Sequence, residues 1–147
     1  MSGTDDNAIV AARNFVASLP HCRALGMVVE AAGDGVATLS MPYSEALIGD
    51  PGTGVIHGGA ISALMDTSGG VAVLSHSTGA AMTATMDLRI DYMRAAEPGG
   101  RITARAHCRH VTRSVAFVRA EAFDEMPGSG PVAVANGAFA LERATDP

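Results

Sequence analysis

The sequence predicts an α+β fold in which an antiparallel sheet wraps around one long helix. A helix with an apolar stripe is expected from about Gly58 to about Ser77, and four strand-like segments follow it in succession. Strands that cluster after a helix, instead of alternating with helices, favour antiparallel pairing. The stripe is too wide to stay in water, and the sheet is the only large surface that can bury it. Its members are Ile61, Leu64, Met65, Ser68 and Ala72, with Val71 at the edge.

The composition predicts one domain spanning residues 1–147. Hydrophobic residues make up 48% of the chain and Trp is absent, so aliphatic side chains and Met must fill the core. The formal net charge of −5 argues against a nucleic-acid partner, since such binding needs a cationic face.

The expected location is the cytoplasm. Cys22 and Cys108 are too few for a disulfide framework, which suits a reducing compartment. The first residues are acidic where a signal peptide would be basic, and no apolar run approaches the roughly 18 residues that span a bilayer. We therefore expect no membrane association.

The segments before the long helix predict a short helix, a hairpin and a loop. The short helix is expected over 5–19 and ends at Pro20. The hairpin pairs Leu25–Ala31 with Val36–Met41 through an Asp-Gly turn, and residues 43–56 form an ordered loop. The apolar side of the short helix consists of Ile9, Val10, Phe15, Val16 and Leu19.

Alternation predicts which way the later strands face. In Thr83–Tyr92 one face carries Met86, Leu88, Ile90 and Tyr92, and the other carries Thr85, Asp87, Arg89 and Asp91. In Arg101–Val111 the inner set is Ile102, Ala104, Ala106 and Cys108. The segments Ser114–Phe123 and Val132–Glu142 complete the series.

The start of the long helix is a candidate oxyanion site. The first amides of a helix have no internal partners and lie at the positive end of its dipole. Gly58 and Gly59 carry no side chain, so a ligand oxygen can reach their amides. The alternative is a glycine-rich helix start used only for tight packing.

Asp66 is the candidate catalytic carboxylate. It lies inside the helix, where Asp is a poor helix former, so its presence there needs a reason. Helical spacing places it on a mostly small face with Gly59, Ser62, Gly69, Gly70 and Val73. Such a face admits a substrate or a second copy of the helix. A solvated surface aspartate is the alternative.

The spacing of these two features predicts a homo-oligomer. Gly58 and Asp66 are eight residues apart, roughly 12 Å along the axis. A donor and a base must each lie about 3 Å from the reacting centre, so one chain cannot supply both. Two antiparallel helices about a two-fold axis would bring Gly58 of one chain beside Asp66 of the other.

The motif and the strand after it resemble the PaaI-type hotdog acyl-CoA thioesterases. The helix portion is His57-Gly58-Gly59 with Leu64 and Asp66-Thr67, the strand portion runs from Met86 to Ala96, and the similarity covers roughly residues 20–142. The resemblance implies hydrolysis of an acyl-CoA by a dimer or a dimer of dimers, with coenzyme A present only as part of the substrate and no cofactor.

The resemblance also implies roles for individual residues. Gly58 matches the oxyanion glycine, and His57 matches a histidine that helps to place the thioester. Asp66 matches the carboxylate that activates water or attacks directly. Thr85 matches a hydroxyl residue that, in some members, orients the water from the partner strand side. Gly59 is a further candidate contact to the substrate.

The sequence departs from the family pattern near the thioester. The family often has Asn or Gln six residues before the histidine, where this chain has Pro51, and Asp50 is the candidate replacement. The phosphates of coenzyme A need cations. Arg94 and Arg113 are the first candidates, with Ser114 beside the latter; ordinary solvated arginines are the alternative.

Two other functions remain open from the sequence. One is a hotdog hydratase that acts on enoyl thioesters without releasing thiol. The other is a non-catalytic acyl-CoA-binding protein. A metal site is not expected, because His107 and Cys108 point to opposite faces of their strand and no paired ligand motif is present. A Ser-His-Asp enzyme is not expected either, since no nucleophile elbow is present.

Overall fold

A computed structural model describes residues 3–126 and 128–144. The helices are α1 (Gly3–Ser18), α2 (Pro20–Leu25) and α3 (Gly58–Leu74), with one 3-10 turn, η1 (Glu45–Leu47). The strands are β1 (Val28–Gly33), β2 (Val36–Met41), β3 (Ile48–Asp50), β4 (Val55–Ile56), β5 (Ala80–Tyr92), β6 (Ile102–Val111), β7 (Val115–Phe123) and β8 (Ala133–Arg143).

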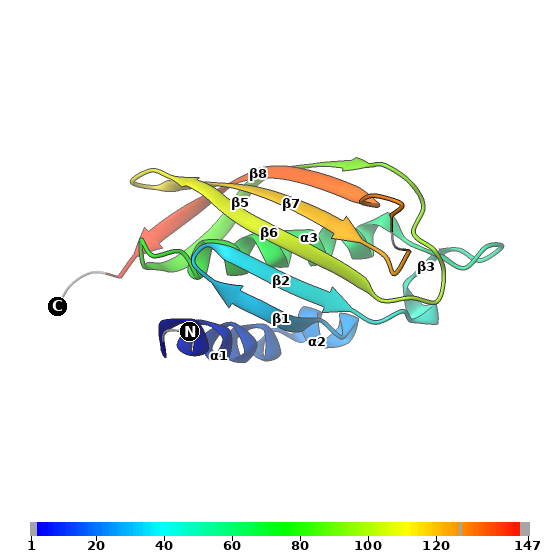
Figure 1. Ribbon diagram of the computed structural model, residues 1–147, viewed down its shortest axis with the longest axis horizontal. Helices are drawn as coiled ribbons and strands as arrows, with labels where there is room; N and C mark the ends of the chain where they lie inside the picture. Colours follow the sequence, from blue (N-terminus) through cyan, green and yellow to red (C-terminus); the bar gives the residue numbers. More distant parts are fainter. Residues whose placement is uncertain (1–2, 127, 145–147) are drawn as a thin grey trace.

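Six of these strands form one antiparallel sheet in the order β1-β2-β6-β7-β8-β5. The sheet curves around α3, which runs along its concave side, as Figure 1 shows. The predicted α+β architecture, an antiparallel sheet around one long central helix, is therefore confirmed. Among the described residues, no helix is long and apolar enough to cross a membrane.

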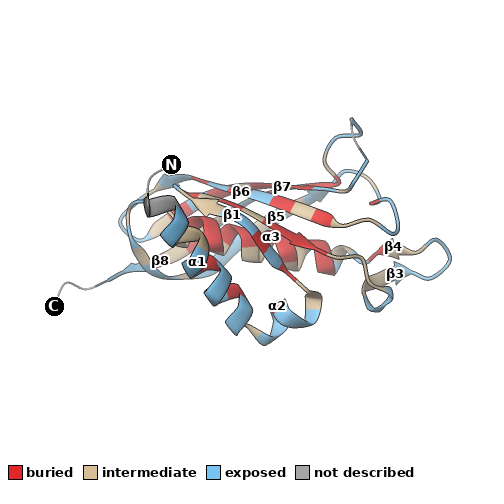
Figure 2. Cartoon of the chain, turned by 60° about the horizontal axis from the view of Figure 1, so that its bottom comes forward, coloured by how far each residue is buried: buried red, intermediate tan, exposed pale blue. Residues whose placement is uncertain are grey.

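The core lies between α3 and the inner face of the sheet (Figure 2). The predicted stripe of α3 is buried, with Leu64, Met65 and Ala72 at 0% exposure. The predicted inner residues of β6, from Ile102 to Cys108, are buried as well. Gly69 lets the helix approach the sheet closely, because a Cβ at that position would lie 2.6 Å from the Phe139 ring.

The N-terminal segment differs from the prediction on both sides of Pro20: the first helix spans Gly3–Ser18, and the strand expected over Leu25–Ala31 spans Val28–Gly33 because Leu25 belongs to α2. Pro20 ends the first helix, as expected, but it also begins a second one, α2, at the N-terminal position where proline is favoured. The apolar side of α1 is only partly used: Val16 is buried, whereas Val10 and Phe15 are exposed. The ordered loop predicted over 43–56 contains η1 and the small β3-β4 hairpin.

The strict alternation predicted for Thr83–Tyr92 is wrong in its first half. The pairing of β5 with β8 shifts register between Thr85 and Asp87, so Met86 is an extra residue in a β-bulge. Met86 is 62% exposed instead of facing inward with Leu88. The bulge reverses the faces, so Thr85 points towards α3, where its hydroxyl reaches Asp66.

Candidate active site

The carboxylate of Asp66 lies on the half-buried side of α3 that faces β5. Thr85 Oγ1 donates to Asp66 Oδ1 at 2.5 Å. Because a carboxylate has several lone pairs, this bond fixes the orientation of Asp66 and leaves the second oxygen free to act as a base or a nucleophile. The Thr85 hydroxyl comes from the same chain as Asp66.

The first turn of α3 presents one free amide. His57 is the N-cap residue, and its Nδ1 accepts a hydrogen bond from Gly59 N at 2.8 Å. The amide of Gly59 is therefore occupied. Within residues 3–126 and 128–144, no acceptor is found for Gly58 N, so this N–H is the one available to a substrate oxygen. Of the two predicted glycines, the geometry favours Gly58 as the oxyanion donor.

The cap also sets the tautomer of His57. Since Nδ1 accepts, the ring proton of the neutral imidazole is on Nε2. The side chain is exposed, so Nε2–H is available as a donor towards a bound molecule. His57 N donates to Leu47 O at 2.8 Å, and a Cβ at Gly49 would lie 2.7 Å from His57 Cα. The segment from η1 to β3 therefore packs directly against the backbone of His57.

Tyr92 is a site residue that the sequence reasoning missed. Its hydroxyl donates to Gly58 O at 2.9 Å, and a Cβ at Gly58 would lie 3.2 Å from its ring. The contact ties the end of β5 to the first residue of α3. Tyr92 and Gly58 are 34 positions apart, so no local pattern signals it.

A hollow of about 280 Å³ adjoins His57. It lies between α2, the η1-β3 segment and the first turns of α3. Its lining is mostly apolar and includes a second histidine, His21, from α2. The other lining residues are Leu25, Ala46, Leu47, Ile48, Gly59, Ala60 and Ala63.

The small face around Asp66 is narrower than predicted. Gly69 is packed against Phe139, and Val73 is 1% exposed, so both belong to the core. Gly59, Ser62 and Gly70 remain at least partly exposed on the Asp66 side. This remaining surface is what a second helix or a substrate could approach.

Asp50 is held in the turn between β3 and β4. Its Oδ1 accepts from Gly52 N at 3.0 Å, and its Oδ2 accepts from Thr53 Oγ1 at 2.7 Å. These bonds shape the exposed loop around Pro51. Within one chain, both oxygens of the Asp50 carboxylate therefore accept hydrogen bonds from the turn itself. The role of Asp50 near the thioester stays a prediction.

Arg94 forms a structural ion pair with Asp124. Arg94 Nη1 and Nη2 donate to the two Asp124 oxygens at 2.7 and 2.8 Å, and the Asp124 side chain is 1% exposed. The remaining Arg94 donors reach the carbonyls of Ser129, Gly130 and Ala95. The guanidinium has no donor left over, so its predicted role in phosphate binding stays untested and the geometry favours a structural one.

We expect Asp124→Asn to lower the free energy of unfolding, because Arg94 would lose the buried carboxylate that accepts two of its hydrogen bonds. The hydrogen bond from Arg94 holds the pKa of Asp124 well below its usual range. A lowered folded-state pKa means that this stabilisation is present above about pH 4 and is lost as the pH falls further. Urea unfolding between pH 3 and 7 measures both effects. The loss of stability that the wild type shows below about pH 4 should be smaller in the variant. A urea midpoint at pH 7 that is the same in the variant and the wild type would contradict a stabilising role for the ion pair.

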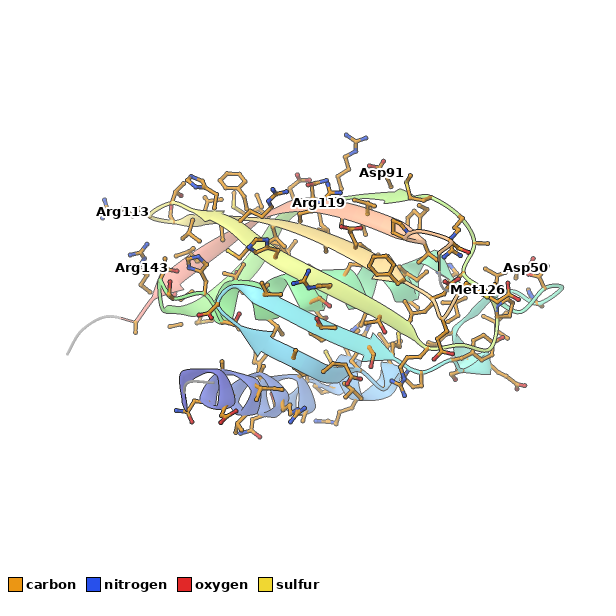
Figure 3. The ribbon with its side chains drawn as sticks, viewed as in Figure 1. Asp50, Asp91, Arg113, Arg119, Met126 and Arg143 are labelled. Carbon is orange, nitrogen blue, oxygen red and sulfur yellow. The ribbon has the colours of Figure 1, made fainter. Side chains whose placement is uncertain are left out.

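Arg113 and Ser114 lie in the exposed turn between β6 and β7. Figure 3 shows Arg113 and Asp50 at opposite ends of the long axis of the molecule. One chain does not bring Arg113 to its own His57, so its predicted contact with a substrate requires a second copy. Among the described residues, no group of His, Cys, Asp and Glu could hold a metal ion.

The chain matches known proteins over most of its length. A family model described as the thioesterase superfamily matches residues 53–130, which is more than half of the chain. A Halobacterium salinarum protein that carries an esterase name is 36% identical over 97% of this chain and 99% of its own length. The chain belongs to the thioesterase superfamily. It is a hotdog thioester hydrolase of the PaaI type, as the sequence predicted.

Three further proteins are similar to this chain. The medium/long-chain acyl-CoA thioesterase YigI of Escherichia coli is 29% identical over 76% of this chain and 79% of its own length. A crystal structure of a Pseudomonas aeruginosa protein is 44% identical, with a TM-score of 0.79 over 90% of this chain and 98% of that one. A mutant of the phenylacetic acid degradation protein PaaI from Thermus thermophilus is 27% identical, with a TM-score of 0.72 over 86% of this chain and 100% of that one.

Proposed function

We propose that this thioesterase hydrolyses acyl-CoA to the free acid and coenzyme A at a site shared by two chains. Asp66 acts as the base or nucleophile, and the Gly58 amide of a second chain binds the oxyanion. The observation that carries the proposal is that α3 holds both an oriented Asp66 carboxylate and a free Gly58 N–H. Within one chain these two groups are too far apart along the helix axis to act on the same carbonyl. The acyl-CoA substrate named for YigI supports the substrate class.

The chemistry requires few groups. A thioester carbonyl is electrophilic and its thiolate leaves readily, so one base and one preorganised donor suffice. Asp66 takes a proton from water, or attacks the carbonyl carbon itself, while Gly58 N–H donates to the developing oxyanion. His57 Nε2–H is a second donor that would orient the thioester. The reaction as proposed needs no cofactor, and coenzyme A enters only as part of the substrate.

The free edge of the sheet supports the dimer. β5 is the last strand in the order and, in the part of the chain that the structure describes, it pairs with β8 alone. Its thirteen residues expose the side chains of Met82 and Met86 at 65% and 62%. A long unpaired edge with apolar side chains is a template for another strand. Pairing β5 with its two-fold copy would bring the two α3 helices side by side and antiparallel.

We expect Thr85→Val to lower kcat roughly 10- to 100-fold, because it removes a hydrogen bond to a charged catalytic group. Thr85→Ser keeps the hydroxyl and should retain most of the activity. Thr83→Val is the matched control, since the Thr83 hydroxyl donates to Ala140 O and not to Asp66. Steady-state kinetics of the three variants measure the effect. Equal losses in the Val and Ser variants at position 85 would contradict a role for the hydroxyl.

A thiol-release assay over short, medium, long and aromatic acyl-CoAs tests the proposed function. We expect free coenzyme A to appear with at least one of these groups. The absence of thiol release with every substrate, combined with tight acyl-CoA binding, would overturn the proposal. An enoyl-CoA that is hydrated without thiol release would overturn it in favour of a hydratase.

A further inference from the structure

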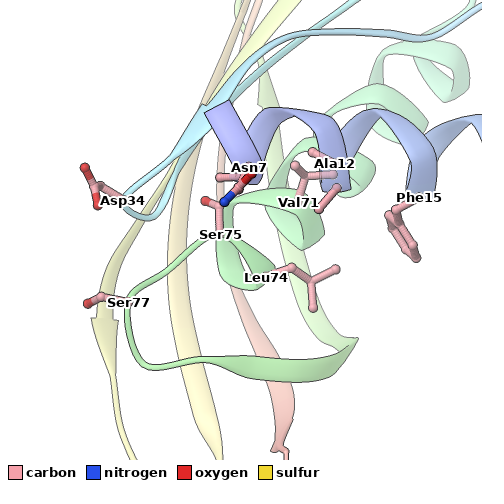
Figure 4. Close-up of a pocket in the computed structure, with 10 residues that line it drawn as sticks. Asn7, Ala12, Phe15, Asp34, Val71, Leu74, Ser75 and Ser77 are labelled. Carbon is pink, nitrogen blue, oxygen red and sulfur yellow. The ribbon is translucent and has the colours of Figure 1, made fainter. Parts of the chain in front are cut away.

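A cavity lies between α1 and the C-terminal half of α3, outside the residues assigned above. Its volume is about 650 Å³. The lining is apolar along most of its length, through Ala8, Ala11, Ala12, Phe15, Val71 and Leu74. Asn7, Asp34, Ser75 and Ser77 supply the polar atoms. Figure 4 shows Asp34 and Ser77 gathered at one end and Phe15 at the other.

The apolar end of this cavity points towards Asp66. α1 and α3 run in opposite directions along the molecule (Figure 1). Asn7 and Ser75 both line the polar end, and Phe15 follows Asn7 by eight residues, roughly 12 Å along α1 in the direction of Asp66. The chain continues into α2, where Cys22 Sγ lies 4.0 Å from Thr67 Oγ1, beside Asp66. Of α3, Val71, Leu74 and Ser75 line the cavity, so along the helix axis it begins about five residues, or roughly 7.5 Å, beyond Asp66 and extends away from Gly58.

One helix row connects the carboxylate to the cavity. Asp66, Gly70 and Leu74 follow one another at intervals of four, so they lie in line on one side of α3. Gly70 leaves a gap in this row. A Cβ there would meet only Thr83 Cγ2, at the ordinary distance of 3.8 Å, so packing against the sheet does not explain this glycine as it explains Gly69.

We propose that this cavity between α1 and α3 binds the acyl chain of the substrate and makes the thioesterase selective for medium-length chains. The inference rests on the proposed function and extends it to chain length. The chain leaves the carbonyl at Asp66, crosses Gly70 and lies between Phe15 and Leu74. Chain length is limited because the cavity ends at Asn7, Asp34, Ser75 and Ser77, about nine residues or roughly 13 Å of α3 beyond Asp66. Methylenes beyond that point would meet polar groups and gain nothing.

Each methylene buried in the cavity should raise kcat/KM roughly fourfold, up to the polar end. In the wild-type chain we expect kcat/KM to rise from acetyl-CoA through hexanoyl-CoA to decanoyl-CoA and to stop rising at hexadecanoyl-CoA. Ala11→Trp fills the cavity from its exposed rim. It should lower kcat/KM at least about tenfold for decanoyl-CoA and leave acetyl-CoA within about twofold.

Ala17→Trp is the matched control. It places the same side chain at an exposed position of α1 that does not line the cavity, and it should keep the wild-type profile. An Ala11→Trp enzyme with the wild-type chain-length profile would overturn the proposal. So would a wild-type profile that is flat with chain length. Either result leaves the proposed function intact if coenzyme A is still released.

A binding measurement keeps the inference testable without turnover. The natural chain has no tryptophan, so Phe15→Trp in an Asp66→Asn background gives one emitting group at the rim of the cavity. Decanoyl-CoA should shift its emission to the blue, whereas acetyl-CoA should not. The same measurement on Ala17→Trp in that background should give no shift. Equal responses to the two ligands at position 15 would overturn the cavity as the acyl site.

Discussion

Asp66→Asn is expected to lower kcat by about 1,000-fold or more while the protein folds normally. An amide of the same shape still accepts the hydrogen bond from Thr85, so the packing around position 66 is kept. It cannot take a proton from water and cannot form an acyl anhydride. Thiol release from a good acyl-CoA substrate measures the loss, and circular dichroism with thermal unfolding checks the fold.

Asp87→Asn is the matched control for this variant. Asp87 is an exposed aspartate of β5, next to the bulge but not bonded to Asp66, and its neutralisation should leave kcat within about twofold. Wild-type turnover in Asp66→Asn would remove the carboxylate from the mechanism. If the loss is seen, a single turnover in oxygen-18 water separates the two routes, because label in the Asp66 carboxylate indicates direct attack.

The spacing of apolar residues correctly predicted which side chains face the core in elements that are buried on one face. The stripe of α3 and the inner residues of β6 face the core as expected, since a shift of register there would expose a whole apolar set. The β5 bulge was not predictable in this way. It depends on the partner strand β8, where position 137 is a glycine. A Cβ at this position would lie 2.5 Å from the carbonyl oxygen of Asp87, so a larger residue would clash with the bulged strand. Bulges of this kind have no signature within their own strand.

The same limit applies to the candidate site. Helix rules alone singled out Gly58 and Asp66, and the family resemblance supplied His57 and Thr85. Alternation placed Thr85 on the wrong face, and the bulge is what turns it towards Asp66. The contact of Tyr92 with Gly58 and the cavity beneath α1 join segments far apart in the chain, so they become visible only after folding.

Gly58→Pro is expected to lower kcat about 100- to 1,000-fold by removing one oxyanion donor. The first position of a helix tolerates proline, and His57 already has the extended backbone, ψ 133°, that a residue before proline adopts. The added carbon atoms would press on Tyr92, whose ring lies 3.2 Å from a Cβ at this position. Gly58→Ala carries the same Cβ but keeps the N–H, so the difference between the two variants reports the amide alone. Equal kcat values for Ala and Pro would show that the Gly58 amide is not the donor.

Mixing two inactive variants tests whether the site is shared. Chains with Asp66→Asn keep the amide donor, and chains with Gly58→Pro keep the carboxylate. If each site takes Gly58 from one chain and Asp66 from the other, a mixed dimer has one intact site and one doubly damaged site. Random reassembly after denaturation of equal amounts makes about half of the dimers mixed, so about a quarter of the wild-type activity should return. A site contained in one chain would show no recovery, because every chain in the mixture would still lack one of the two groups.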